Sequence, residues 1–176
     1  MRLFIAIDIK ELESFFKELQ KQIPLDLAKI KLTDSFHLTL KFLGEVSEQK
    51  IESIQNALHE IAFKEFLLTF NHIGFFPDEN YIRVVWVGVK ESKEVIQLQK
   101  EIDTSLVRLF TKERNFHPHI TLGRVKFVKD KFGFISKIKE IKVQEHTIKV
   151  INFKLIKSTL TGEGPIYEDL AEFVAN

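Results

Sequence analysis

Two short segments of the chain carry the same arrangement of a histidine and a threonine. They are Phe36-His37-Leu38-Thr39-Leu40 and Pro118-His119-Ile120-Thr121-Leu122. Two His-x-Thr matches with aliphatic neighbours arise by chance in fewer than about 1% of sequences with this composition. The histidines are 82 positions apart, close to half of the 176 residues, so the chain is predicted to contain two related halves.

The spacing within each segment suits a β-strand that presents polar groups to one side. Residues i and i+2 of a strand point to the same face, about 6.6 Å apart, so each copy offers an imidazole and a hydroxyl together. Two imidazoles suit acid–base chemistry near neutral pH, because one can accept a proton while the other donates one. Threonine hydroxyls can donate to the non-bridging oxygens of a phosphate. The alternative is that each histidine is an ordinary half-buried strand residue.

A second alternative is a zinc site made of histidines. His117 lies two positions before His119, and His37 could supply the third imidazole of a catalytic zinc centre. Two features argue against it: the first motif has threonine where a second pair of ligands would need histidine, and no acidic residue between Asn115 and Lys129 could orient a ligand. The remaining histidines have no repeat partner and are predicted to be ordinary surface or half-buried residues: His59, His72 and His146.

Hydrophobic periodicity predicts strands interspersed with helices and joined in places by tight turns. Alternation along 36–43 places His37, Thr39 and Lys41 on one face, and turn residues at 77–80 predict a hairpin. This pattern favours an α+β fold over a doubly wound parallel one. The predicted strands are 2–9, 30–32, 36–43, 66–76, 81–89, 117–125, 145–160 and 167–174; the predicted helices are 12–24, 47–61, 92–110 and 129–141, the last interrupted by Gly133.

Composition limits the kinds of chemistry that this chain can perform. Cysteine is absent, which excludes disulfides, thiol nucleophiles and thiolate metal sites. The 26 basic and 25 acidic side chains nearly balance, yet nine lysines lie between Lys126 and Lys157, so that segment is predicted to face a polyanion. Apolar runs are too short for a membrane span or a signal peptide, which predicts a cytoplasmic protein. Abundant lysine and a single Met favour a thermophilic source.

Beyond the two motifs, the chain resembles the 2H phosphoesterases, and within them the RNA 2′,3′-cyclic phosphodiesterases, also called 2′-5′ RNA ligases. The resemblance implies one bilobal domain over residues 1–176, in which two pseudo-symmetric lobes, each an antiparallel sheet backed by helices, enclose a central cleft. It covers nearly the whole chain through segments that occur in the family's order: Arg2–Ile7, His37–Gly44, Arg83–Trp86, His119–Val125, Ser158–Leu160 and Gly164–Tyr167.

The resemblance also implies roles for single residues. His119 is expected to be the general base and His37 the general acid, with Thr39 and Thr121 as phosphate donors. Arg124 matches a family arginine near the phosphate; strict strand alternation would point it away from the motif, so a bulge is expected at Gly123.

Phe42 lies at the same distance after His37 as Arg124 does after His119, where it could stack on a nucleobase or simply belong to the core.

The implied activity is hydrolysis of terminal 2′,3′-cyclic phosphates on RNA to 2′-phosphates without metal or cofactor, and its reverse would be 2′-5′ ligation. The expected partners are RNAs with cyclic phosphate ends, tRNA fragments among them, and the chain is expected to be monomeric with no membrane partner. A contrasting hypothesis is an RNA-end binding module in which turnover is incidental. One assay separates the two: incubation with an RNA that carries a cyclic phosphate end, followed by analysis of that end.

Overall fold

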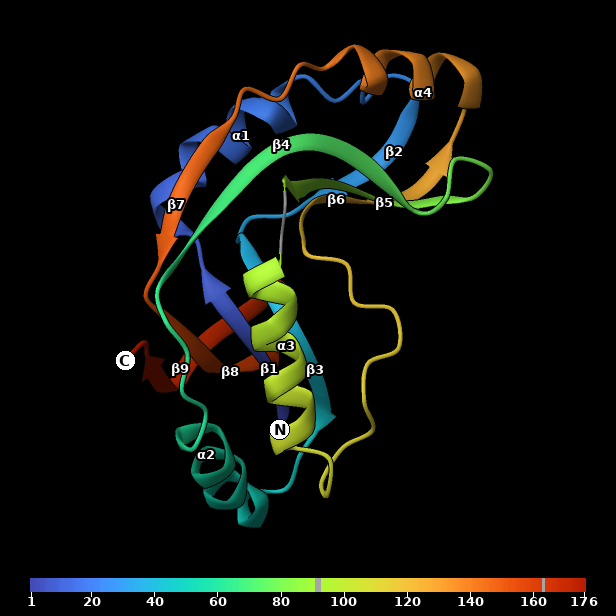
Figure 1. Cartoon of the computed structure of the whole chain (residues 1–176). Helices are drawn as coiled ribbons and strands as arrows, with labels where there is room; N and C mark the ends of the chain where they lie inside the picture. Colours follow the sequence, from blue (N-terminus) through green and yellow to red (C-terminus); the bar gives the residue numbers. More distant parts are fainter. Residues whose placement is uncertain (91–92, 163) are drawn as a thin grey trace.

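The computed structural model describes residues 1–90, 93–162 and 164–176, which form two antiparallel sheets with helices on their outer faces (Figure 1). Sheet A has the strand order β3-β1-β8-β9. Its strands are β1 (Arg2–Asp8), β3 (His37–Glu45), β8 (Asn152–Leu160) and β9 (Pro165–Val174).

Sheet B is strongly curled and has the order β2-β6-β5-β4-β7 (Figure 1). All its pairings are antiparallel, as are those of sheet A, so the predicted α+β class with two antiparallel sheets is confirmed. Its strands are β2 (Ala28–Leu32), β4 (Phe66–Pro77), β5 (Ile82–Lys90), β6 (His119–Val128) and β7 (His146–Val150).

Four α-helices among the described residues cover the outer faces of the sheets. The helices α1 (Glu13–Lys21) and α4 (Lys131–Glu140) pack on sheet B, whereas α2 (Ile51–His59) and α3 (Lys93–Ser105) pack on sheet A (Figure 1). Two 3₁₀ turns, Lys10–Leu12 and Glu48–Lys50, lead into α1 and α2. None of these helices is long and apolar enough to cross a membrane.

Two predictions about helices were wrong. The helix expected over 92–110 ends at Ser105, and its expected first residue, Ser92, lies outside the described residues. Gly133 does not interrupt α4. It lies in the first turn, where backbone N–H groups have no partner within the helix, and its N–H donates to Asp130, the N-cap.

The single long strand predicted over 145–160 was also wrong, because the chain changes sheets in the middle of it. β7 pairs with β4 in sheet B, and β8 pairs with β1 and β9 in sheet A. Ile151 is the only residue between the two strands and is 48% exposed. Val150 and Ile151 are adjacent apolar residues, so the alternation shifts by one position at this point. That shift is the local sign of the change, and the single-strand prediction overlooked it.

The core lies between each sheet and its helices. On sheet A, Leu3, Ile5 and Ile7 of β1 point to the helices and are at most 1% exposed. The opposite face of β1 carries Phe4 and Ala6, which form a small separate cluster with Ile156 of β8. This second cluster is the buried floor beneath the space between the two sheets.

Candidate active site

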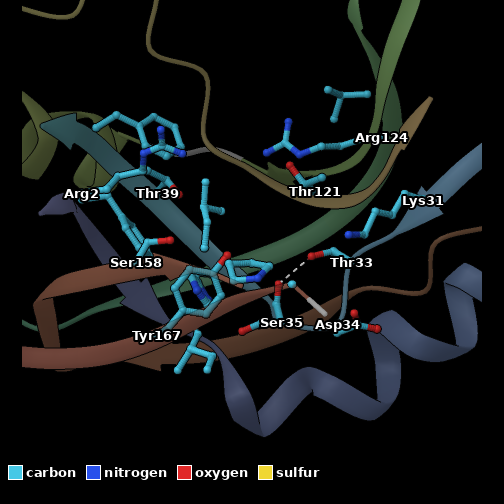
Figure 2. A pocket seen from close by; sticks show the side chains of 18 of the residues that line it. Arg2, Lys31, Thr33, Asp34, Ser35, Thr39, Thr121, Arg124, Ser158 and Tyr167 are labelled. Carbon is cyan, nitrogen blue, oxygen red and sulfur yellow. Dashed lines mark hydrogen bonds between the residues drawn. The ribbon is translucent and has the colours of Figure 1, made fainter. Parts of the chain in front are cut away.

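A cleft of about 820 Å³ lies between the two sheets. It is lined by residues of β1, β3, β8 and β9 from sheet A and of β2, β4, β5 and β6 from sheet B. Figure 2 shows Thr39 on one side of it and Thr121 with Arg124 on the other. The cleft brings together all six residues singled out in the sequence: His37, Thr39, Phe42, His119, Thr121 and Arg124.

A β-bulge in β6 turns Arg124 into the cleft. Thr121 pairs with Trp86 and Gly123 with Val85, which leaves Leu122 as an extra residue in the strand. Leu122 and Gly123 are therefore both buried, and Arg124 returns to the cleft face. The bulge predicted at Gly123 is confirmed.

The same bulge occurs in β3, where the sequence did not predict it. Ala6 pairs with Thr39 and Ile5 with Lys41, which leaves Leu40 as the extra residue. Phe42 consequently lies on the cleft face with a 68% exposed side chain, so it is not a core residue. The two motif strands thus have the same local geometry in both halves.

Lys41 was wrongly placed on the face of His37 and Thr39, because the bulge reverses its direction. Its side chain is 4% exposed and forms an ion pair with Asp103 of α3. The ammonium also donates to the carbonyl of Thr111 at 2.7 Å. Asp103 accepts two more hydrogen bonds, from Gln99 Nε2 at 2.8 Å and from the backbone N–H of Glu113 at 2.9 Å.

His119 is held in one tautomer by its own backbone neighbour. Its Nδ1 lies 2.7 Å from the carbonyl oxygen of His117. Because a carbonyl can only accept, Nδ1 carries the proton, and Nε2 is the basic nitrogen of the neutral ring. Burial lowers the pKa of His119; the hydrogen bond to His117 opposes this, and the nearby charges of the His117 and Arg124 side chains lower it further.

His37 is held by aromatic rings. Phe4 stacks on it with a centroid distance of 5.4 Å and an interplanar angle of 3°, and Tyr167 meets it edge-on at 4.6 Å. Its Nε2 is buried and has no hydrogen-bond partner among the described residues. Burial lowers the pKa of His37, and the nearby charge of Lys10 adds to that shift, while the carboxylates of Asp8 and Asp169 oppose it.

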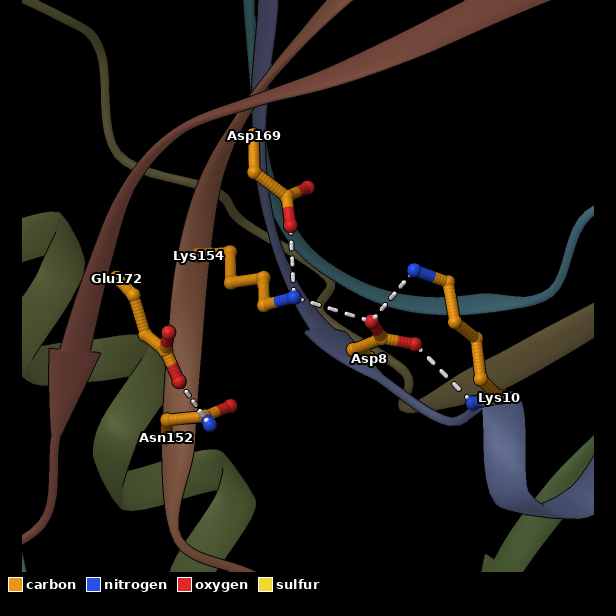
Figure 3. Close-up of polar contacts among 6 residues, drawn as sticks. All are labelled: Asp8, Lys10, Asn152, Lys154, Asp169 and Glu172. Atoms are coloured by element: carbon orange, nitrogen blue, oxygen red, sulfur yellow. Dashed lines mark hydrogen bonds and ion pairs between the residues drawn. The ribbon is translucent and has the colours of Figure 1, made fainter.

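These two carboxylates belong to a polar cluster beside His37 (Figure 3). Asp8 is paired in register with His37, and Lys154 donates to Asp8 at 3.1 Å and to Asp169 at 2.7 Å. Lys10 donates its backbone N–H to Asp8 at 3.1 Å. Burial alone would raise the pKa of Asp8, but the hydrogen bonds from Lys154 and Lys10 outweigh it, so the pKa lies below its ordinary value. Asp8 is therefore charged at neutral pH.

Trp86 of β5 supports the opposite wall. Its indole packs against Phe76 and His117, with centroid distances of 4.8 Å to each, and lies 6.2 Å from His119. The ring lies directly over Gly74, its partner across the β4–β5 ladder. A Cβ at Gly74 would overlap the indole carbons.

We expect Gly74→Ala to lower the free energy of unfolding by about 1–3 kcal/mol, because the added methyl group must push the Trp86 ring out of its place. Denaturant unfolding measures the loss. Gly162→Ala is the matched control, since an added Cβ there meets open space. Equal stability of the two variants would show that the indole moves without cost.

Several cleft residues were not identified from the sequence as site residues. Arg2 and Phe4 alternate with Ala6 and Asp8 along β1, so their common face could have been read from strand periodicity. Lys31 reaches the cleft because β2 pairs with β6, a pairing that leaves no local signal. Tyr167 lies in Gly164–Tyr167, one of the segments on which the family resemblance rests. Its contact with His37, however, depends on β9 joining sheet A.

The zinc alternative requires His37, His117 and His119 to converge on one ion. Among residues 1–90, 93–162 and 164–176, no three His, Asp or Glu side chains are arranged to hold a metal. The His117 ring instead packs edge-on against Phe76 at 5.6 Å. The geometry supports proton transfer and hydrogen bonding to an anion.

Comparison with known proteins finds similarity along the whole chain. The profile of LigT-like phosphoesterases matches twice, over residues 7–86 and 87–167, which agrees with the internal repeat. A Methanocaldococcus jannaschii protein named RNA 2′,3′-cyclic phosphodiesterase is 41% identical over 178 residues, covering 98% of this chain and 100% of that protein. An Archaeoglobus fulgidus protein of the same name is 36% identical, covering 98% and 99%.

Solved structures show the same architecture. The TT0787 protein of Thermus thermophilus superimposes with a TM-score of 0.78 at 26% identity, covering 99% of this chain and 97% of that one. Escherichia coli LigT complexed with 3′-AMP gives a TM-score of 0.75 at 27% identity, with the same coverage.

Proposed function

We propose that this chain, which belongs to the LigT-like phosphoesterase family, hydrolyses terminal 2′,3′-cyclic phosphates on RNA and leaves a 2′-phosphate. The observation that carries the proposal is the cleft itself, in which a histidine and a threonine from β3 lie opposite a histidine and a threonine from β6. Such a site offers two proton carriers and two hydroxyl donors around one small anion.

The surroundings of the two imidazoles support different roles for them. The neutral ring of His119 keeps a free Nε2, and Arg124 nearby disfavours its charged form, so we assign His119 as the general base. The carboxylates of Asp8 and Asp169 favour the charged form of His37, so we assign His37 as the general acid.

The reaction then proceeds in one displacement at phosphorus. His119 Nε2 takes a proton from water as the water oxygen attacks the cyclic phosphate, and the bond from phosphorus to the 3′-oxygen breaks. His37 gives its proton to that leaving oxygen, so the product carries a 3′-hydroxyl and a 2′-phosphate. Thr39 and Thr121 donate to the non-bridging oxygens, and Arg124 offsets the charge that develops there.

The same site could run in reverse, joining a cyclic phosphate end to a 5′-hydroxyl end through a 2′-5′ linkage. Hydrolysis is favoured because water is in vast excess over RNA ends.

End-group analysis tests the proposed function. Incubation of an RNA that carries a 2′,3′-cyclic phosphate should yield a 2′-phosphate terminus, resolved from the 3′-phosphate isomer by chromatography. An unchanged terminus with retained binding would identify an RNA-end binding module instead. A 3′-phosphate product would show that the bond from phosphorus to the 2′-oxygen breaks instead.

We expect a bell-shaped pH dependence of kcat/KM that persists in EDTA. His119 must be neutral, so activity is lost as the pH falls; His37 must be charged, so activity is lost as the pH rises. Burial lowers both pKa values below the ordinary 6.5, which places the maximum of kcat/KM below about pH 6.5. The acid and alkaline sides of the profile give apparent pKa values that belong to the coupled pair of histidines rather than to either one alone.

Steady-state rates from pH 4 to 9, with and without prolonged chelation, provide the measurement. A zinc enzyme would lose activity on chelation and regain it with added metal.

A further inference from the structure

The cleft continues into an exposed surface along the ladder between β2 and β6. At the inner end, Lys31 pairs with Arg124, and both line the cleft (Figure 2). Two positions further out, Lys29 pairs with Phe127. We propose that this outer surface, made of Lys29, Lys126 and Phe127 and called here the β2–β6 track, binds the single-stranded RNA that precedes the terminal cyclic phosphate; the inference rests on the proposed function.

The strand register places the track on the cleft face of sheet B. Ile30 pairs with Val125, and both belong to the core side. Lys29 pairs with Phe127, so Lys126 is an extra residue in β6, a second bulge. A bulge of this kind turns two consecutive side chains to the same side, and Lys126 and Phe127 are both exposed. Because α1 and α4 cover the other face, the track faces solvent beside the cleft.

The charges on the track are available to phosphates. Among the described residues, no carboxylate lies within ion-pair distance of Lys29, Lys31 or Lys126. By contrast, four lysines further along the basic segment are paired with acidic residues elsewhere in the chain. They are Lys139 with Glu79, Lys149 with Glu65, Lys154 with Asp8 and Asp169, and Lys157 with Glu168.

The prediction that the whole of 126–157 faces RNA is therefore restricted here to its first residues. Those residues lie on the β2–β6 ladder that continues the cleft.

Phe127 supplies a surface for a base. Its side chain is 61% exposed although it lies within a strand, and a lysine stands across the ladder from it. An exposed ring among cations is the arrangement on which single-stranded nucleic acids stack. Because Lys126 is an extra residue, the ladder advances two positions from Arg124 to Phe127. At about 3.3 Å per residue this is roughly 7 Å, the length of about two stacked bases. Because a cyclic phosphate ends an RNA on its 3′ side, the segment that reaches the track is the 5′ neighbour of the terminal nucleotide.

The test compares KM for a nucleoside 2′,3′-cyclic phosphate with KM for RNA oligonucleotides of two to eight residues that end in the same group. In the wild-type protein, KM should fall as the RNA lengthens to about three nucleotides and then level off. Phe127→Ala should raise KM for the longer RNAs about 5-fold or more and leave KM for the mononucleotide unchanged. Phe132→Ala is the matched control, because Phe132 is 89% exposed on α4, beyond the end of the ladder.

The lysines are tested with variants of equal charge. Lys29→Gln/Lys126→Gln should reduce the salt dependence of oligonucleotide binding by roughly 0.7 in log–log slope for each phosphate that the variant no longer neutralises. Lys137→Gln/Lys142→Gln removes the same charge elsewhere and should leave the slope unchanged. Equal effects of the two double variants, or a mononucleotide KM that changes as much as the oligonucleotide KM, would overturn the proposal.

Failure of the proposed function would look different. If the wild-type protein hydrolyses neither substrate, fluorescence anisotropy with a labelled oligonucleotide still reports binding to the track and its loss in Phe127→Ala. Preferred binding to a duplex end over a single strand would also contradict the proposal.

Discussion

Replacing either His37 or His119 with alanine should lower kcat for a 2′,3′-cyclic phosphate by about 10²- to 10⁴-fold, the usual contribution of a general acid or base. Thr39→Ala and Thr121→Ala should cost less, since each removes a hydrogen-bond donor rather than a proton carrier. Steady-state kinetics on purified variants with unchanged melting temperature would show it. His59→Ala, on α2 and outside the cleft, is the matched control. Near-wild-type turnover in either cleft variant would disprove the two-histidine mechanism.

A substrate with a better leaving group separates the two roles. A phosphodiester that releases p-nitrophenolate needs no proton on its leaving oxygen, so His37→Ala should recover most of its lost activity on it. His119→Ala should remain impaired, because the attacking water still needs a base. The opposite pattern would exchange the assignments of acid and base.

Removing the carboxylate of Asp103 should produce the largest loss of stability. Asp103→Ala leaves the Lys41 ammonium buried without a counter-ion, which typically costs about 3–5 kcal/mol of unfolding free energy. Burial alone would raise the pKa of Asp103, but hydrogen bonds from Lys41, Gln99 and the Glu113 N–H outweigh it and hold the pKa below 3.8. The stabilisation is therefore present above about pH 4. It is lost as the pH falls through the pKa that Asp103 has in the folded protein.

Urea unfolding at neutral pH measures the effect, and two variants calibrate it. Lys41→Met/Asp103→Leu removes both charges together and should recover most of the stability. Glu18→Ala breaks the exposed pair with Lys21 and should change the unfolding free energy by about 1 kcal/mol or less. A small effect of Asp103→Ala would mean that water reaches the ammonium.

The sequence predicted the parts of the site that depend on local periodicity. Alternation placed His37 with Thr39 and His119 with Thr121, and Gly123 indicated the bulge that turns Arg124 inwards. The matching bulge at Leu40 was missed because the residue after it is a lysine rather than a glycine. Lysine signals an exposed position, yet here it is buried against a carboxylate from a helix 62 residues away.

The parts that could not be predicted depend on which strands pair. Lys31 reaches the cleft only because β2 joins β6, and Tyr167 reaches His37 only because β9 joins β8. Neither pairing has a signature within its own segment. The break at Ile151 does have a local sign, since the adjacent apolar residues Val150 and Ile151 shift the alternation by one position. That shift does not show which sheet each strand joins.

The exchange of strands between the sheets has a consequence for how the site forms during synthesis. In sequence, β2 lies between β1 and β3 of sheet A, yet it joins sheet B. Sheet A is completed by β8 and β9, which come from the far end of the chain. A growing polypeptide that has already passed both His-x-Thr segments therefore still lacks β8, β9 and the Tyr167 ring that meets His37 edge-on. Catalytic competence should appear abruptly, when synthesis has passed Tyr167, and a chain cut between the two repeats should give two fragments that are inactive until they are mixed.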